Sequence, residues 1–246
     1  MKAFVDLEEE FLLRKLVVGA VAAAAALGYT GAAVAQTEGV SVQARIAPAK
    51  AGTAKKPKAA RLSFAMSVNL PTATVGDIKL RWPATVRMSG KGFKRCNFDD
   101  LIATGPTACP GGSAAGAIGS AAAAVGPARA PLIFRVNAFV EDANTLLFYL
   151  NQAGGGVQTV VRGEIRGRQL TITIPQELRQ PGGLDATLTS LRYTFAGKAG
   201  KNAIVATTGC KARRHALTGT LDFSPRLDGA AVPAPVSSSV NSACRA

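Results

Sequence analysis

Residue types that could carry catalysis are sparse in this chain of 246 residues. His215 is the only histidine, and a catalytic histidine needs a nucleophile and an orienting acid beside it in space. It is in phase with Leu217 and Leu221, which predicts a place on the same face of a strand. No G-x-S-x-G nucleophile motif occurs. The residues therefore predict no catalytic group, and the alternative is a secreted hydrolase whose site is assembled from dispersed residues such as His215, Asp99 or Glu164.

Carboxylate pairs and glycine-rich loops give no stronger signal. Asp99-Asp100 and Glu141-Asp142 are adjacent pairs, and adjacent side chains diverge on both helices and strands, so we interpret them as capping or turn residues. The glycine-rich residues 110–119 lack the Lys-Ser/Thr ending of a phosphate-binding loop. We therefore expect no cofactor-binding and no metal-binding residues.

The four cysteines predict two disulfides. Spacing favours pairing Cys96 with Cys109, and Cys210 with Cys244. A redox or metal site is the alternative, but no C-x-x-C motif is present and a single histidine is available. Paired cysteines are typical of exported proteins.

Residues 1–35 resemble a secretory signal peptide in composition. Arg14 and Lys15 precede an apolar, alanine-rich run, and Ala33-Val34-Ala35 supplies the small residues of a cleavage site. We expect cleavage before Gln36 and a secreted or cell-envelope location, with no membrane span in the mature chain. The alternative is an uncleaved anchor, because residues 16–35 are about as long as a membrane-spanning helix requires.

A strongly basic composition, with a formal net charge of +14, predicts attraction to polyanions. Residues 36–60 hold few large apolar side chains and are predicted to form a flexible basic arm. Lys50, Lys55, Lys56 and Lys58 of this arm are the predicted binding residues for an anionic surface or polymer, such as a cell wall or membrane head groups. Specific binding to nucleic acid is not expected, because few aromatic residues stand among the basic ones.

The remaining sequence predicts an all-β fold, a single β-sandwich domain over residues 61–223 with one short helix. Apolar residues alternate with polar ones at 62–70, 78–82 and 132–140, and turn-forming residues separate such runs. The helix is expected at 97–104, where Asn97 can cap it and Gly105-Pro106 can end it. Residues 224–246 form a low-complexity tail that Cys244 ties back to the domain.

One segment resembles a known group of proteins. The residues CNFDDLIATGPTACPGGSAAGAIG at 96–119 are similar to a Cys…Gly-Pro…Cys-Pro-x-Gly-Ser-x-x-Gly segment of uncharacterised secreted actinobacterial proteins. The likeness extends loosely to the basic residues before Arg61 and to Thr207-Thr208-Gly209-Cys210. It implies secretion, disulfides and an all-β fold, and it carries no activity. Together these features predict an exported, non-enzymatic binding or structural module of the cell envelope or extracellular space.

Overall fold

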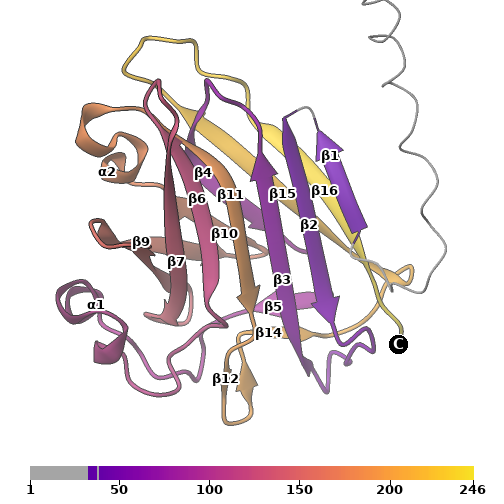
Figure 1. The fold of residues 1–246 in the computed structure, drawn as a ribbon. Coiled ribbons are helices and arrows are strands. Elements are labelled where there is room, and N and C mark those ends of the chain that lie inside the picture. The colour runs from indigo at the N-terminus through magenta and orange to yellow at the C-terminus, as the bar shows by residue number, and fades with distance from the viewer. Residues whose placement is uncertain (1–32, 38) are drawn as a thin grey trace, which may run out of the picture. The chain divides into compact units, whose positions relative to one another are not determined.

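Antiparallel strands dominate the computed structural model, which describes residues 33–37 and 39–246 (Figure 1). The all-β prediction is confirmed. The predicted signal segment lies outside the described residues except for 33–35, which belong to the edge strand β1 (Ala33–Thr37). No helix within the described ranges is long and apolar enough to cross a membrane.

The other elements follow along the chain. The strands of the first half are β2 (Val40–Ala47), β3 (Lys58–Val68), β4 (Thr74–Arg81), β5 (Val86–Met88), β6 (Gly119–Val125) and β7 (Ala130–Val140). Those of the second half are β8 (Thr145–Gln152), β9 (Gln158–Arg166), β10 (Gln169–Thr173), β11 (Ala186–Phe195), β12 (Lys198–Ala199), β13 (Asn202–Ala203), β14 (Val205–Thr207), β15 (Arg214–Ser224) and β16 (Val236–Ala243). The helices are α1 (Phe98–Thr104), α2 (Gln176–Arg179) and the 3-10 turns η1 (Pro106–Ala108) and η2 (Pro181–Gly183). α2 adds a second short helix to the one that we expected.

The main sheet runs in the order β1-β2-β3-β11-β6-β7-β8-β9-β10-β4-β15-β16, and β14 joins β3 to β5. β12 and β13 form a separate hairpin, seen below the sheet in Figure 1. The two ends of the main sheet come together, because β16 packs against β2 and the Ile46 amide donates a hydrogen bond to Ser242 Oγ at 2.9 Å. The sheet therefore curls so that its halves face one another across a shared core, as in a sandwich.

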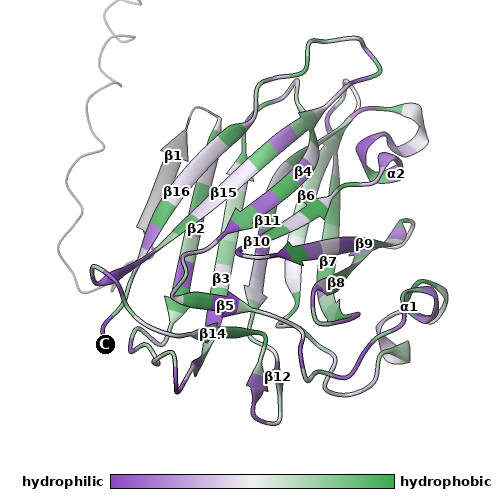
Figure 2. Ribbon diagram, turned by 180° about the vertical axis from the view of Figure 1, so that it is seen from behind, coloured by the Kyte–Doolittle hydropathy of each residue, from purple (hydrophilic) through white to green (hydrophobic). Residues whose placement is uncertain are grey.

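Period-two patterning explains these strands. On β3, Leu62, Phe64 and Met66 are buried, while Arg61 before them and Ser63 between them are exposed. The same alternation of hydrophobic and hydrophilic residues runs along the neighbouring strands (Figure 2). Because successive side chains in a strand point to opposite faces, each strand contributes one apolar row to the core and one polar row to the surface.

The prediction of a flexible arm over residues 36–60 is wrong. Within it, β2 pairs along its length with β3, and Val42 and Ile46 are 1% and 2% exposed. Apolar residues alternate with Ser41, Gln43 and Arg45 here, so the segment has one face that can be buried. The lysines of this segment consequently stand on a loop between two paired strands and on the first residue of β3.

The tail 224–246 is likewise partly regular. Its last residues form β16, which pairs with β15 over eight positions. The predicted Cys210–Cys244 disulfide is present and fastens the end of β16 to the segment before β15. Low sequence complexity in this segment therefore coexists with a defined place in the sheet.

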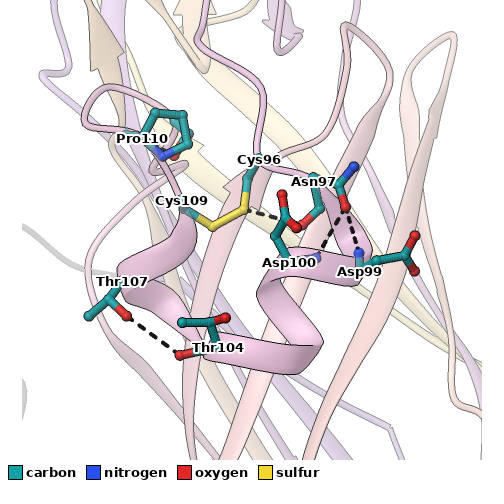
Figure 3. Close-up of a disulfide and its surroundings, with 9 residues drawn as sticks. Cys96, Asn97, Asp99, Asp100, Thr104, Thr107, Cys109 and Pro110 are labelled. Atoms are coloured by element: carbon teal, nitrogen blue, oxygen red, sulfur yellow. Dashed lines mark hydrogen bonds between the residues drawn. A yellow bond between two sulfur atoms is a disulfide. The ribbon is translucent and has the colours of Figure 1, made fainter.

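The predicted short helix is also confirmed, as α1. Its cap is Asn97, whose side-chain oxygen accepts hydrogen bonds from the amides of Asp99 and Asp100 at 2.7 and 3.1 Å (Figure 3). The Cys96–Cys109 disulfide closes the loop that contains the helix. Leu101 of α1 is fully buried in a small second core on the outer side of β7, β8 and β9.

Candidate anion-binding surface

The four predicted lysines lie together at one end of the sheet. Lys50, Lys55 and Lys56 belong to the loop between β2 and β3, and Lys58 is the first residue of β3. All four side chains are exposed.

Hydrogen bonds fix this loop to the body of the domain. The Ala51 amide donates to the Arg245 carbonyl at 2.8 Å, and the Arg245 amide donates to the Ala49 carbonyl at 2.9 Å. The Gly52 amide donates to Thr207 Oγ1 at 3.1 Å. The loop is thus bonded both to the C-terminal segment and to β14.

The turn within the loop has its own local cause. The Thr53 amide donates to the Lys56 carbonyl and the Lys56 amide donates to Thr53 Oγ1, each at 3.0 Å. Gly52 is required before it, since a Cβ there would stand 2.4 Å from the Lys58 amide nitrogen. The backbone therefore orients Lys55 and Lys56 outward without help from an acidic partner.

A second basic segment, the turn over residues 211–214, lies beside the C-terminal segment. Ala212 and Arg213 have φ values of 50° and 57°, a left-handed conformation that side chains other than glycine or asparagine seldom adopt. Such residues cost about 1–3 kcal/mol each and persist where neighbouring bonds hold them. Here the Cys244 amide donates to the Arg213 carbonyl at 2.9 Å, and the Cys210–Cys244 disulfide flanks the turn.

We call the combined surface the basic end. It gathers exposed cationic side chains from three separate segments of the chain: Lys50, Lys55, Lys56, Lys58, Lys211, Arg213, Arg214 and Arg245. Lys50 and Arg245 form a backbone bridge that joins the first segment to the last. Across the described part of the chain, none of these side chains forms an ion pair with a carboxylate. The surface is therefore a concentration of uncompensated positive charge, suited to phosphate or carboxylate groups.

His215, the candidate catalytic residue, is buried rather than presented to a substrate. Its side chain is 1% exposed, and Nδ1 lies 3.0 Å from Thr85 Oγ1. Nε2 is buried and makes no hydrogen bond to a described residue. Burial lowers the pKa of the imidazole.

The structure does not bring the acids of the hydrolase alternative to His215. Asp99 lies in the first turn of α1. Glu164 lies on β9 and pairs with Arg166 at 2.6 Å. The three candidates therefore lie on three different elements, β15, α1 and β9.

An apolar cavity in the core also lacks the groups that a hydrolase needs. It measures about 80 Å³ and lies in the core between the facing halves of the sheet, among side chains such as Phe64, Leu80 and Phe148. Tyr193 is the one ionisable residue in its wall. The Tyr193 hydroxyl accepts a hydrogen bond from the Ala138 amide at 3.2 Å, and burial raises its pKa.

Within residues 33–37 and 39–246, no group of three or more His, Cys, Asp or Glu side chains is placed to hold a metal ion. Comparisons with protein families, with curated proteins and with solved structures found no match. The interpretation of the basic end consequently depends on its own geometry.

Half of the residues of the basic end were not predicted as part of it from the sequence. The four lysines at residues 50–58 were predicted, whereas Lys211, Arg213, Arg214 and Arg245 were not joined to them. A signal was present in Cys244, because its predicted bond to Cys210 already brings the neighbours of both cysteines together. The hydrogen bonds between the loop and Arg245 join backbone atoms, so no residue type in the sequence predicts them.

Proposed function

We propose that this protein is an exported, non-enzymatic binding or structural module that attaches to an anionic polymer or surface through its basic end. The observation that carries the proposal is the gathering of eight exposed cations, free of acidic partners, on three segments fixed by hydrogen bonds and a disulfide. A surface fixed in advance loses little conformational entropy on binding.

The disulfides support the proposed location of the protein in the cell envelope or outside the cell. Both pairs are closed and no cysteine is free, which indicates an oxidising environment. A cell-envelope or extracellular location fits such an environment, and anionic lipids and wall polymers are abundant there. The alternative of a secreted hydrolase gains no support from the placement of His215, Asp99 and Glu164 on three different elements.

The test replaces Lys50, Lys55, Lys56 and Lys58 together with glutamine. Each basic residue near an anionic membrane contributes about 1 kcal/mol, so four replacements should weaken binding to phosphatidylglycerol vesicles several hundredfold at low salt. In 1 M salt the Debye length is about 3 Å, and the two proteins should bind equally weakly.

A matched control removes the same charge elsewhere. Lys91, Lys94, Arg95 and Arg168 are exposed and lie outside the basic end, so their replacement by glutamine should weaken vesicle binding much less. Equal losses in the two sets would show that net charge alone drives attachment. Unchanged binding by the loop-lysine set at low salt would reject the proposal.

A further inference from the structure

A row of arginines crosses the outer face of the sheet next to the basic end. The row consists of Arg192 on β11, Arg45 on β2, Arg61 on β3 and Arg87 on β5. All four side chains are exposed. None of them forms an ion pair within the described residues.

Strand register sets the spacing of this row. Arg192 pairs with Ala65 of β3, and Arg45 pairs with Ser63. Arg61 is the next outward residue of β3. Ala59 follows, and it pairs with Ala206 of β14, which in turn pairs with Arg87. One arginine therefore lies level with each of four successive outward positions of β3, residues 65, 63, 61 and 59, but only Arg61 is on β3 itself.

These positions repeat at a fixed distance. A strand rises about 3.3 Å per residue, so outward positions two residues apart are about 6.6 Å apart along the strand. Neighbouring strands lie about 4.8 Å apart, which keeps the four guanidinium groups within a band a few strands wide. The band runs toward Lys58, and so it leads directly into the basic end.

The strands around the row carry no acidic residue. β2, β3, β5, β11 and β14 contain no aspartate or glutamate. A groove of about 430 Å³ lies across this face, and Arg45 and Arg192 are in its lining. Gln43, Ser63, Ser120 and Thr194 add hydroxyl and amide groups to the lining, and the exposed Ile118 adds an apolar side chain. The aromatic residues of these strands, Phe64, Tyr193 and Phe195, are buried in the core.

We propose that the arginine row binds one linear polyol phosphate chain in extended form, with one phosphodiester at each arginine. Guanidinium groups donate paired hydrogen bonds to phosphate oxygens, and the hydroxyl and amide groups of the groove suit a polyol. Neighbouring arginines lie on different strands, so their backbones are about 8–12 Å apart, and their long side chains converge to reach successive phosphates of one chain. Single-stranded nucleic acid is a poorer match, because this face offers no exposed aromatic platform for its bases.

This inference rests on the proposed function and assigns a ligand class to a surface that adjoins the basic end. The test uses the full chain and poly(glycerol phosphate) fractions of defined length. The affinity should rise steeply as the polymer is lengthened to four phosphates. Further lengthening should add little affinity at each site. Replacing Arg45, Arg61, Arg87 and Arg192 with glutamine should weaken binding to the long polymer several hundredfold at low salt, at about fivefold for each charge.

The glutamine set at Lys91, Lys94, Arg95 and Arg168 is the control for net charge, and it should weaken polymer binding far less. Polymer affinity that is independent of length, or unchanged by the arginine substitutions, would overturn the inference. Row-dependent binding of oligothymidylate as tight as that of the polymer would overturn it in favour of nucleic acid. Vesicle binding by the loop-lysine variant is measured separately, so a failure of the row and a failure of the basic end can be told apart.

Discussion

Replacing Ile46 with alanine measures whether β2 is an integral part of the sheet. The Ile46 side chain is 2% exposed, and its backbone amide donates a hydrogen bond to Ser242 Oγ on β16. Truncating a buried isoleucine to alanine costs about 2–5 kcal/mol through lost burial and the cavity left behind. We expect about 3 kcal/mol, a large part of the roughly 5–15 kcal/mol that stabilises a typical domain.

The neighbouring Arg45 supplies the control. It is exposed on the same strand, so Arg45→Ala should change the free energy of unfolding by less than about 0.5 kcal/mol. Urea denaturation followed through Trp82 is a suitable assay, because Trp82 is the single tryptophan and is 2% exposed. Equal unfolding midpoints for Ile46→Ala and Arg45→Ala would refute the burial argument and restore the flexible arm.

Three further predictions concern the features around the two disulfides. Replacing Cys210 and Cys244 with alanine opens a loop of sequence separation 34, which should cost about 4 kcal/mol in urea denaturation; a loss below about 1 kcal/mol would contradict this. Burial lowers the pKa of His215 from 6.5 in the folded protein, so the unfolded chain binds a proton at this residue more readily. The free energy of unfolding should therefore be highest above about pH 6.5 and should fall as the pH drops below it. The unfolding temperature should decrease less between pH 7.5 and pH 5.5 in His215→Gln than in the wild-type protein. An identical decrease in both proteins would disprove the assignment of this pH dependence to His215. Asn97→Ala removes the cap of α1 and should lower stability by about 1 kcal/mol, which the same urea assay would detect or exclude.

The sequence predicted those strands and helices whose formation depends on residues within the element or next to it. β3 follows from the alternation that begins at Leu62, and α1 follows from the cap at Asn97 and the stop at Gly105. Gly105 has a φ of 81°, a conformation that glycine adopts readily. Both disulfide pairings were also predictable, because few alternatives exist for four cysteines.

β2 and β16 were missed because their segments were judged by average composition. In residues 36–60, lysines and small residues hide the alternation of Val40, Val42, Ala44 and Ile46. In β16 the inward positions include Ser238 and Ser242, both buried, so its apolar row is weak. β16 obtains its place from pairing with β15 and from the disulfide at Cys244, which are long-range constraints.

The candidate surfaces depend on such long-range constraints even more strongly. Like charges repel one another, so a chain has no intrinsic tendency to bring the lysines near Lys50 close to Arg213 and Arg245. They are held there by backbone hydrogen bonds to Arg245, by the hydrogen bond from the Cys244 amide to the Arg213 carbonyl, and by the adjacent disulfide. Each of these restraints acts on the backbone or the sulfur atoms and leaves the charged groups unpaired. The fold thus maintains a repulsive charge cluster that an anionic partner would relieve, which is the physical reason to regard the basic end as a binding surface.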